Sequence, residues 1–423
     1  MTRLRRLIAT ALVDSFGLSL GWTVFSLHVV RGHGLAGLGL CNAAMLCGVA
    51  LSAPAAARLS ARLDGRALLR VTAVTEAALR VGTFVLLLAG TPLVVVAAAV
   101  AASNVVAWTG YAGMRAEVAA ADPRGAAMTW YMVAVAAIEA AGTATAALLP
   151  RGPDGLVTGS LLFAVITCYG ACLLPTWLVA GGARVGRVEA VGRAENGAGV
   201  GSVALPRAGV QAAPPVGVQA APPAGPLAGA LTGPLAGLLA SGGLVMLLGS
   251  GPTLLAVGLA AELHGTRWVA GSALAFAAGS LLAPLSVARL ERRALPPAVA
   301  WPALGVGMVA GWAFAAWRPA ALLAAQFLSG MCMSALEGDM DARVAAGNPS
   351  PQGVTASLAT AAALRAFGSA AAVALAPRII SEAGISGLSV ALVTLLLATM
   401  VITLAWHRRQ SSLPRTGPAA HPG

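Results

Sequence analysis

Long apolar runs, separated by short charged or Gly- and Pro-rich segments, make up most of the chain. Each run has about 17–25 residues or slightly more, the length that crosses the hydrocarbon core of a bilayer as one helix. The pattern predicts twelve transmembrane helices, six in each half of the sequence. We place them at 7–30, 35–57, 67–89, 92–113, 126–149 and 156–180, and at 232–261, 267–288, 296–316, 319–339, 353–377 and 384–406.

The composition excludes a string of soluble domains. Of 423 residues, 58% are hydrophobic and only 10% are charged, and the mean hydropathy is +0.82. Too little polar surface remains to cover water-soluble domains of this size. The net charge of +12 comes from arginines scattered through short loops, which argues against a nucleic acid as partner. The sequence therefore predicts an all-α integral membrane protein embedded in a lipid bilayer.

Two segments of the first half recur in the second half at nearly the same offset. Residues 114–123 and 340–349 share six of ten residues at an offset of 226, with the signs of two charges exchanged. Residues 61–68 and 288–295 share six of eight at an offset of 227. Such a period predicts two halves built on one plan.

The composition changes between and after the two halves. Around residues 181–226 the apolar density falls, and the unit G-V-Q-A-A-P-P occurs twice. Pro-Pro pairs favour extended conformations and cannot continue a helix, so this segment is predicted to be a disordered cytoplasmic linker. We therefore expect a six-helix bundle at 1–180, the linker at 181–226, a second bundle at 227–407 and a disordered tail at 408–423.

The arginines predict the orientation of the chain in a cytoplasmic membrane. If the N-terminus is cytoplasmic, twenty arginines fall on the inner side and five on the outer side. Cytoplasmic loops carry the excess of basic residues, so both termini are predicted to be cytoplasmic.

Two six-helix halves, a long central linker and Arg-rich loops after the second and eighth helices resemble the major facilitator superfamily (MFS). The resemblance implies a secondary transporter, most simply a monomer without a cofactor, that moves a small molecule by alternating access. In that fold the fifth and eleventh helices line opposite walls of a central cavity. The glycine-rich end of the fifth helix typical of drug and proton antiporters is absent, because Gly142 is followed by T-A-T-A-A-L-L-P.

Three charged residues in the apolar runs are the best candidates for substrate binding or proton coupling. Glu139 and Arg365 lie near the middle of the fifth and eleventh helices, again 226 positions apart, and each is followed three residues later by a glycine. A charge at the bilayer centre costs about 2.5–3.5 kcal/mol on insertion scales, so it needs a function or a partner. By the resemblance, both would face one cavity, where a substrate could bridge them or Glu139 could take up a proton. The alternatives are a structural ion pair, or a partner on a neighbouring helix for each charge. Asp14 in the first helix could bind a cation or a proton, or could be structural.

Other residues have more local interpretations. Glu76 and Arg80 are four apart, and we expect a self-neutralising pair. The run G-S-G-P at 249–252 is expected to interrupt the seventh helix. The candidates for lining the cavity are Asn42, Asn104, Trp108, Tyr111, Trp130, Tyr131 and Gln326, although aromatic residues also gather at membrane interfaces.

Clusters of charge at the cytoplasmic helix ends predict two gates. We expect Glu337, Asp339 and Asp341 to pair with arginines of the loop after the eighth helix, and an equivalent cluster in the first half. The predicted gate residues are Arg62, Asp64, Arg66, Arg115 and Glu117 in the first half, and Arg289, Arg292, Arg293, Asp339, Asp341 and Arg343 in the second.

The chain offers little for an enzyme. Its five histidines have no paired spacing, and its five cysteines lie in apolar runs without a metal-binding pattern, so Cys168 and Cys172 are interpreted as packing residues. Within transport, the sequence favours export of a metabolite or drug-like molecule, with proton coupling, as in an antiporter, left open. An importer of a zwitterionic or anionic molecule and a non-transporting scaffold or lipid-handling protein are the alternatives.

Overall fold

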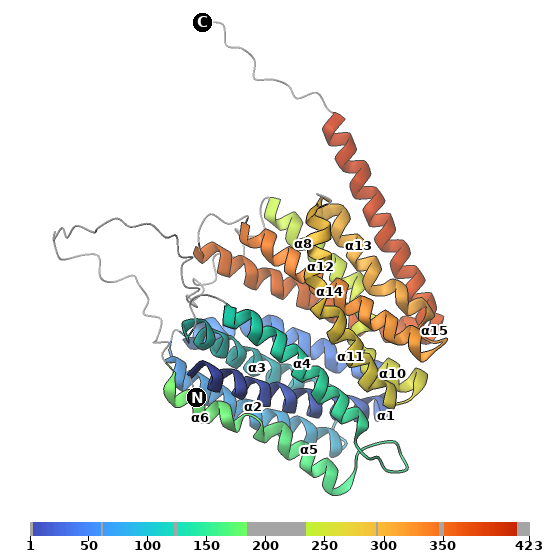
Figure 1. The fold of residues 1–423 in the computed structure, drawn as a ribbon. Helices are drawn as coiled ribbons and strands as arrows, with labels where there is room; N and C mark the ends of the chain where they lie inside the picture. Colours follow the sequence, from blue (N-terminus) through green and yellow to red (C-terminus); the bar gives the residue numbers. More distant parts are fainter. Residues whose placement is uncertain are drawn as a thin grey trace, which may run out of the picture. The chain divides into compact units, whose positions relative to one another are not determined.

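The structure, a computed structural model, is built from helices packed side by side (Figure 1). It describes residues 3–60, 62–121, 126–183, 234–292, 295–346 and 351–412. Within those residues every regular element is helical, as the sequence predicts. Most of the predicted linker (181–226) and of the tail (408–423) lies outside the described residues.

The helices of the first half begin with a long hairpin. In α1 (Arg3–Ser60) the chain reverses at Gly34, whose φ of 63° lies in the left-handed region that glycine adopts without strain. The elements that follow are α2 (Gly65–Leu88), α3 (Leu93–Ala121), α4 (Ala126–Leu148), α5 (Gly159–Ala171), α6 (Leu174–Val179) and the 3₁₀ turn η1 (Ala180–Gly182).

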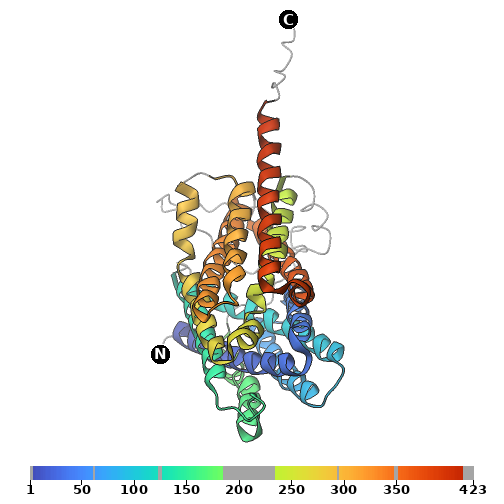
Figure 2. The ribbon, with the colours of Figure 1, turned by 90° about the vertical axis from the view of Figure 1, so that its right-hand side faces the viewer.

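The helices of the second half end with a similar hairpin. In α15 (Pro351–Ser412) the chain reverses at Gly384, with a φ of 70°, and the helix then runs on toward the C-terminus (Figure 2). The elements before it are α8 (Pro234–Gly249), α9 (Gly251–Leu254), α10 (Ala256–His264), α11 (Arg267–Leu281), α12 (Ala283–Arg292), α13 (Pro297–Ala310), η2 (Gly311–Phe314) and α14 (Pro319–Ala346).

The predicted number of membrane crossings is confirmed for the described residues. Eight helical stretches are long and apolar enough to span a membrane, and two of them, with 58 and 48 residues, are the hairpins of α1 and α15. Counting each hairpin twice and adding the shorter apolar helices Ala134–Leu148 and Leu239–Gly249 gives twelve crossings. The chain is therefore an integral membrane protein.

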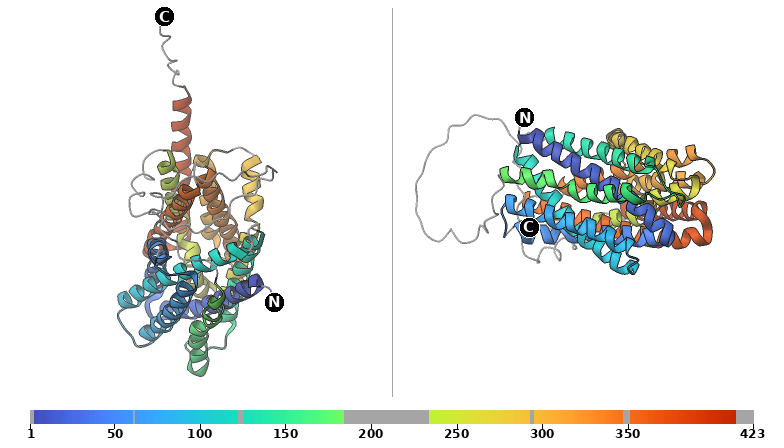
Figure 3. Two further views of the ribbon diagram at one scale, coloured as in Figure 1. Left: turned by 90° about the vertical axis from the view of Figure 1, so that its left-hand side faces the viewer. Right: turned by 90° about the horizontal axis from the view of Figure 1, so that it is seen from below.

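The contacts divide the chain into two units, which we describe separately. The first unit contains residues 3–28, 44–183 and 351–359 of the described chain, and the second contains 29–43, 234–346 and 360–412. Within each unit, helices distant in the sequence lie side by side, as the two further views in Figure 3 show. In the first unit α2 packs against α3 and α5; in the second, α14 packs against α11, α12 and α13.

The seventh predicted crossing is interrupted, as the G-S-G-P run predicts. Helix α8 ends at Gly249, and a second break at Leu255 separates α9 from α10. Asn42, which belongs to the same unit, donates from Nδ2 to the backbone oxygen of Leu254, 2.8 Å away. This buried amide therefore binds the backbone where the helix is broken.

Equivalent glycines make equivalent contacts in the two units. A Cβ atom on Gly142 of α4 would lie 2.6 Å from the backbone oxygen of Phe16 in α1. A Cβ atom on Gly368 of α15 would lie 2.2 Å from the backbone oxygen of Gly243 in α8. The two glycines are 226 residues apart in the sequence, and the residues that they contact, Phe16 and Gly243, are 227 apart. The repeat seen in the sequence is therefore also a repeat of helix packing.

Replacing either glycine with alanine should destabilise the protein. The added methyl group would force two helix backbones apart, and overpacking of this kind costs about 1–3 kcal/mol. We expect Gly142→Ala and Gly368→Ala each to lower the unfolding temperature of the detergent-solubilised protein.

Gly82→Ala is the matched control, because nothing lies within 4 Å of a Cβ atom at that helical position. There the better helix propensity of alanine, about 0.5–1 kcal/mol, should leave the protein unchanged or more stable. Equal effects of all three substitutions would contradict the close packing.

Candidate functional site

A buried cluster of charges joins α1 and α2 in the first unit. Arg80 Nη1 lies 2.9 Å from Asp14 Oδ1, and Arg80 Nη2 donates to Glu76 Oε1. The predicted pairing of Glu76 with Arg80 is confirmed, and Asp14 is a second carboxylate on the same guanidinium. Only 2% of the Arg80 side chain is exposed, whereas 28% of the Asp14 side chain is.

Helix α5 and the residue after it complete the surroundings of Arg80. The Nη1 group of Arg80 also donates to the backbone oxygen of Tyr169 at 3.4 Å and to Cys172 Sγ at 3.2 Å. The guanidinium carbon lies 5.3 Å from the centre of the Tyr169 ring, within the range of a cation–π interaction. A buried arginine is tolerated here because its charge, both of its terminal amino groups and its flat face have partners.

The cluster has an imbalance of charge. With both carboxylates ionised, Asp14 and Glu76 carry one negative charge more than Arg80 neutralises. Glu139 on α4 adds a third carboxylate, which interacts electrostatically with Asp14. Its position follows from packing, since Gly142, one turn later, holds α4 directly against α1. An excess of negative charge around one arginine favours binding of a proton or another cation.

The second unit has its own charged pair. Arg365 Nη1 lies 2.5 Å from Asp341 Oδ1, and a second hydrogen bond joins Nη2 to Oδ2 at 3.4 Å. The Asp341 side chain is 44% exposed and that of Arg365 is 11% exposed. Arg365 thus already has a carboxylate partner within its own unit, and Glu139 and Arg365 belong to different units.

Among the described residues, the acidic gate residues Asp339 and Asp341 have partners other than the arginines of α12. Asp339 accepts hydrogen bonds from Trp301 Nε1 and from Arg343 Nε, each at 2.7 Å, and Asp341 binds Arg365. Arg289 and Arg292 are exposed on α12 instead. The reason is tertiary: α13 packs against α14 and brings an indole N–H to the carboxylate of Asp339. Arg293 lies outside the described residues.

The first-half gate residues also have other partners. Glu117 is buried and pairs with Arg3 of α1. Asp64 caps α2 by accepting from the backbone nitrogen of Ala67 at 2.7 Å, as aspartate at a helix N-terminus commonly does. Arg115 lies over the ring of Tyr111, 5.7 Å from its centre, and Arg62 and Arg66 are exposed.

The candidate cavity residues are dispersed. Asn104 bonds to Val100 of its own helix, and Trp108 is exposed and stacks edge-on with Tyr111 at 5.5 Å between centres. Gln326 is buried in α14, and its Oε1 atom has no hydrogen-bond partner in the described structure. The side chains of Trp130 and Tyr131 lie outside the described part. Within this set, the described contacts join Trp108 to Tyr111.

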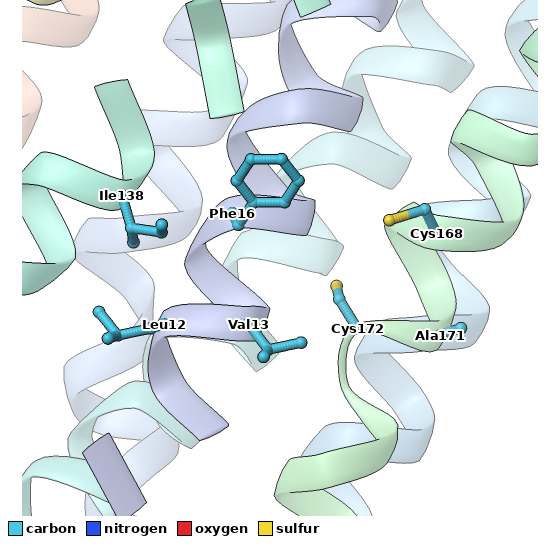
Figure 4. Close-up of a pocket in the computed structure, with 7 residues that line it drawn as sticks. All are labelled: Leu12, Val13, Phe16, Ile138, Cys168, Ala171 and Cys172. Carbon is cyan, nitrogen blue, oxygen red and sulfur yellow. The ribbon is translucent and has the colours of Figure 1, made fainter. Parts of the chain in front are cut away.

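A pocket of about 440 Å³ lies in the first unit beside the charged cluster. Its wall is apolar apart from two thiols, and Figure 4 shows both sulfur atoms turned toward the pocket. The lining residues are Leu12, Val13 and Phe16 of α1, Ile138 of α4, and Cys168, Ala171 and Cys172 at the end of α5.

Replacing Arg80 should destabilise the protein strongly. Arg80→Met would leave two carboxylates without their counter-charge, and breaking a buried ion pair in this way costs about 3–5 kcal/mol. We expect a large fall in the unfolding temperature of the purified protein in detergent.

Arg378→Met is the control, because Arg378 forms an exposed pair with Glu382 on one helix face. Such surface pairs contribute little, so its unfolding temperature should stay near that of the wild type. An Arg80 variant as stable as the Arg378 variant would refute the assigned role of the buried cluster.

The comparison of the sequence with known proteins gives no relative. No family model matches the chain, and no curated protein is significantly similar to it. The similarity lies in the fold.

Solved structures of membrane transporters match the chain over nearly its whole length. The nucleoside transporter NupG matches with a TM-score of 0.68 and 10% identity, covering 96% of this chain and 99% of NupG. A D-xylose–proton symporter matches with a TM-score of 0.62 and 13% identity over 94% of this chain and 96% of the symporter. A bacterial homologue of the iron transporter ferroportin matches with a TM-score of 0.55 and 18% identity, covering 96% and 100%. The chain therefore has the fold of the major facilitator transporters that its sequence resembles.

Proposed function

We propose that the chain is a proton-coupled secondary transporter that exports a small metabolite or drug-like molecule across the cytoplasmic membrane by alternating access. The observation that carries this proposal is the buried cluster of Asp14, Glu76 and Arg80. Helix packing alone needs one carboxylate to neutralise the buried guanidinium of Arg80. The second carboxylate leaves an excess negative charge, which a transporter that binds and releases a proton can use.

Asp14 is the proposed proton carrier. It is the more exposed of the two carboxylates on Arg80, and the negative charge of Glu139 on α4 repels its own negative charge. Protonation of Asp14 would weaken its bond to Arg80 while Glu76 keeps the guanidinium neutralised. One proton would therefore change the contact between α1 and α2, which is the kind of local change that biases a two-state helical unit.

The pair of Arg365 and Asp341 is the proposed substrate-responsive feature of the second unit. Asp341 is nearly half exposed, and its bond to Arg365 can be exchanged for a bond to an anionic group of a substrate. Glu139 remains a candidate for proton coupling together with Asp14. Export is favoured because the pocket beside the cluster is apolar. The excess of arginines on one side supports cytoplasmic termini.

Transport in proteoliposomes should depend on a pH gradient and on Asp14. The compounds to compare are a nucleoside, a pentose, an organic anion and an amphipathic cation, each measured with and without the gradient. For the compound that is moved, Asp14→Asn should reduce gradient-driven transport at least tenfold, because the carboxylate can no longer bind a proton. Exchange of labelled for unlabelled compound without a gradient should continue.

Glu382→Gln is the control, since Glu382 is exposed on α15 of the second unit, whereas the charged cluster lies on α1 and α2 of the first. Gradient-driven transport unchanged in Asp14→Asn would remove Asp14 from the mechanism. Inward accumulation against the gradient would favour an importer, and transport of none of these compounds would favour the scaffold alternative.

A further inference from the structure

We propose that Cys168 and Cys172 form a two-thiol site for an apolar compound of trivalent arsenic. The two cysteines are four residues apart, so their side chains leave consecutive turns at the end of α5 on one face. Both line the 440 Å³ pocket, and both sulfur atoms are turned toward it (Figure 4). Both are free thiols.

The number of sulfur donors in the pocket, two, determines which kind of ion or compound can bind there. Among the described residues, no group of three or more His, Cys, Asp or Glu side chains is arranged to hold a metal ion. Trivalent arsenic needs only two thiols, and soft sulfur donors match its chemistry. A third substituent on arsenic stays in place when the two sulfurs bind.

The walls of the pocket suit an apolar third substituent. The other lining residues are apolar, and Val13 of α1 is turned toward Cys172 (Figure 4). Val13 at its edge is 47% exposed, so the pocket is open to the surroundings of the helices. A phenyl group fits this volume and avoids water, whereas a charged substituent would lose its hydration without gaining a partner.

The reaction balances without an oxidant or a reductant. Phenylarsine oxide carries one oxygen on arsenic. Each thiol forms one sulfur–arsenic bond, both arsenic–oxygen bonds break, and the two thiol protons leave with the oxygen as one water molecule. Arsenic stays trivalent, and the protein gains one phenylarsenic group and loses two hydrogens.

Binding of the arsenical would change the hydrogen bonds between Cys172 and the charged cluster. Cys172 Sγ accepts a hydrogen bond from Arg80 at 3.2 Å. Its single proton can be donated to the backbone oxygen of Tyr169, 3.3 Å away, or to Asp14 Oδ1, 3.8 Å away. The adduct removes this proton, so Cys172 can no longer donate to either oxygen. An effect on transport would rest on the proposed function; the binding itself does not.

Intact-protein mass spectrometry tests the site without any transport assay. The purified full chain is treated with phenylarsine oxide in excess 2-mercaptoethanol, which removes arsenic held by single thiols. We expect one phenylarsenic group per chain, removed by 2,3-dimercaptopropanol. Cys168→Ser and Cys172→Ser should each abolish the adduct. Serine at 172 keeps an acceptor for Arg80, and Cys168 is only partly buried, so both variants should elute as folded protein on size exclusion.

The triple variant Cys41→Ser, Cys47→Ser, Cys332→Ser is the matched control and should keep the full adduct. Loss of the adduct in this variant, its persistence in either single variant, or no adduct in the wild type would each overturn the proposal.

Discussion

The first unit depends on one guanidinium that serves two carboxylates inside an apolar helical bundle. Arg80 binds Asp14 of α1 and Glu76 of its own helix, and it also contacts Tyr169 and Cys172 at α5. Neither an arginine nor a carboxylate is tolerated alone in this environment. Separating these charges would therefore be costly, and this cost fixes the positions of α1, α2 and α5 relative to one another. The same arrangement leaves a negative charge in excess, and the proposal of proton binding rests on that excess.

The second unit keeps the packing plan but uses other charges. The glycine contacts between α4 and α1 are repeated between α15 and α8, at offsets of 226 and 227 residues. Where the first unit has Glu139 near Asp14, the second has Arg365 bound to Asp341. The contacts between backbones, which tolerate only glycine, thus occur in both units, while the charged side chains on the same helices differ. The proposed roles, proton-responsive for the first unit and substrate-responsive for the second, follow this difference.

The sequence predicted well what depends on local pattern. Apolar run length gave the twelve crossings, the G-S-G-P run marked the broken helix, and a spacing of four residues identified the pair of Glu76 and Arg80. The partners of Asp14, Asp339 and Asp341 could not be predicted, because they come from other helices whose rotation the pattern does not fix. Trp301 gave no signal as a ligand of Asp339, since an indole in an apolar run is normally a packing residue. The spacing of Cys168 and Cys172 was visible, but only the pocket beside them distinguishes a site from packing.

A double-mutant cycle between Asp14 and Arg80 tests the central claim most directly. The free energy of unfolding is measured for the wild type, Asp14→Asn, Arg80→Gln and the double variant. If Arg80 holds Asp14, the double variant will be more stable than the sum of the single effects predicts, by about 0.5–3 kcal/mol, because removing Arg80 no longer leaves that carboxylate unpaired. Effects that add to within about 0.3–0.5 kcal/mol would show that the two residues do not interact and would contradict the account.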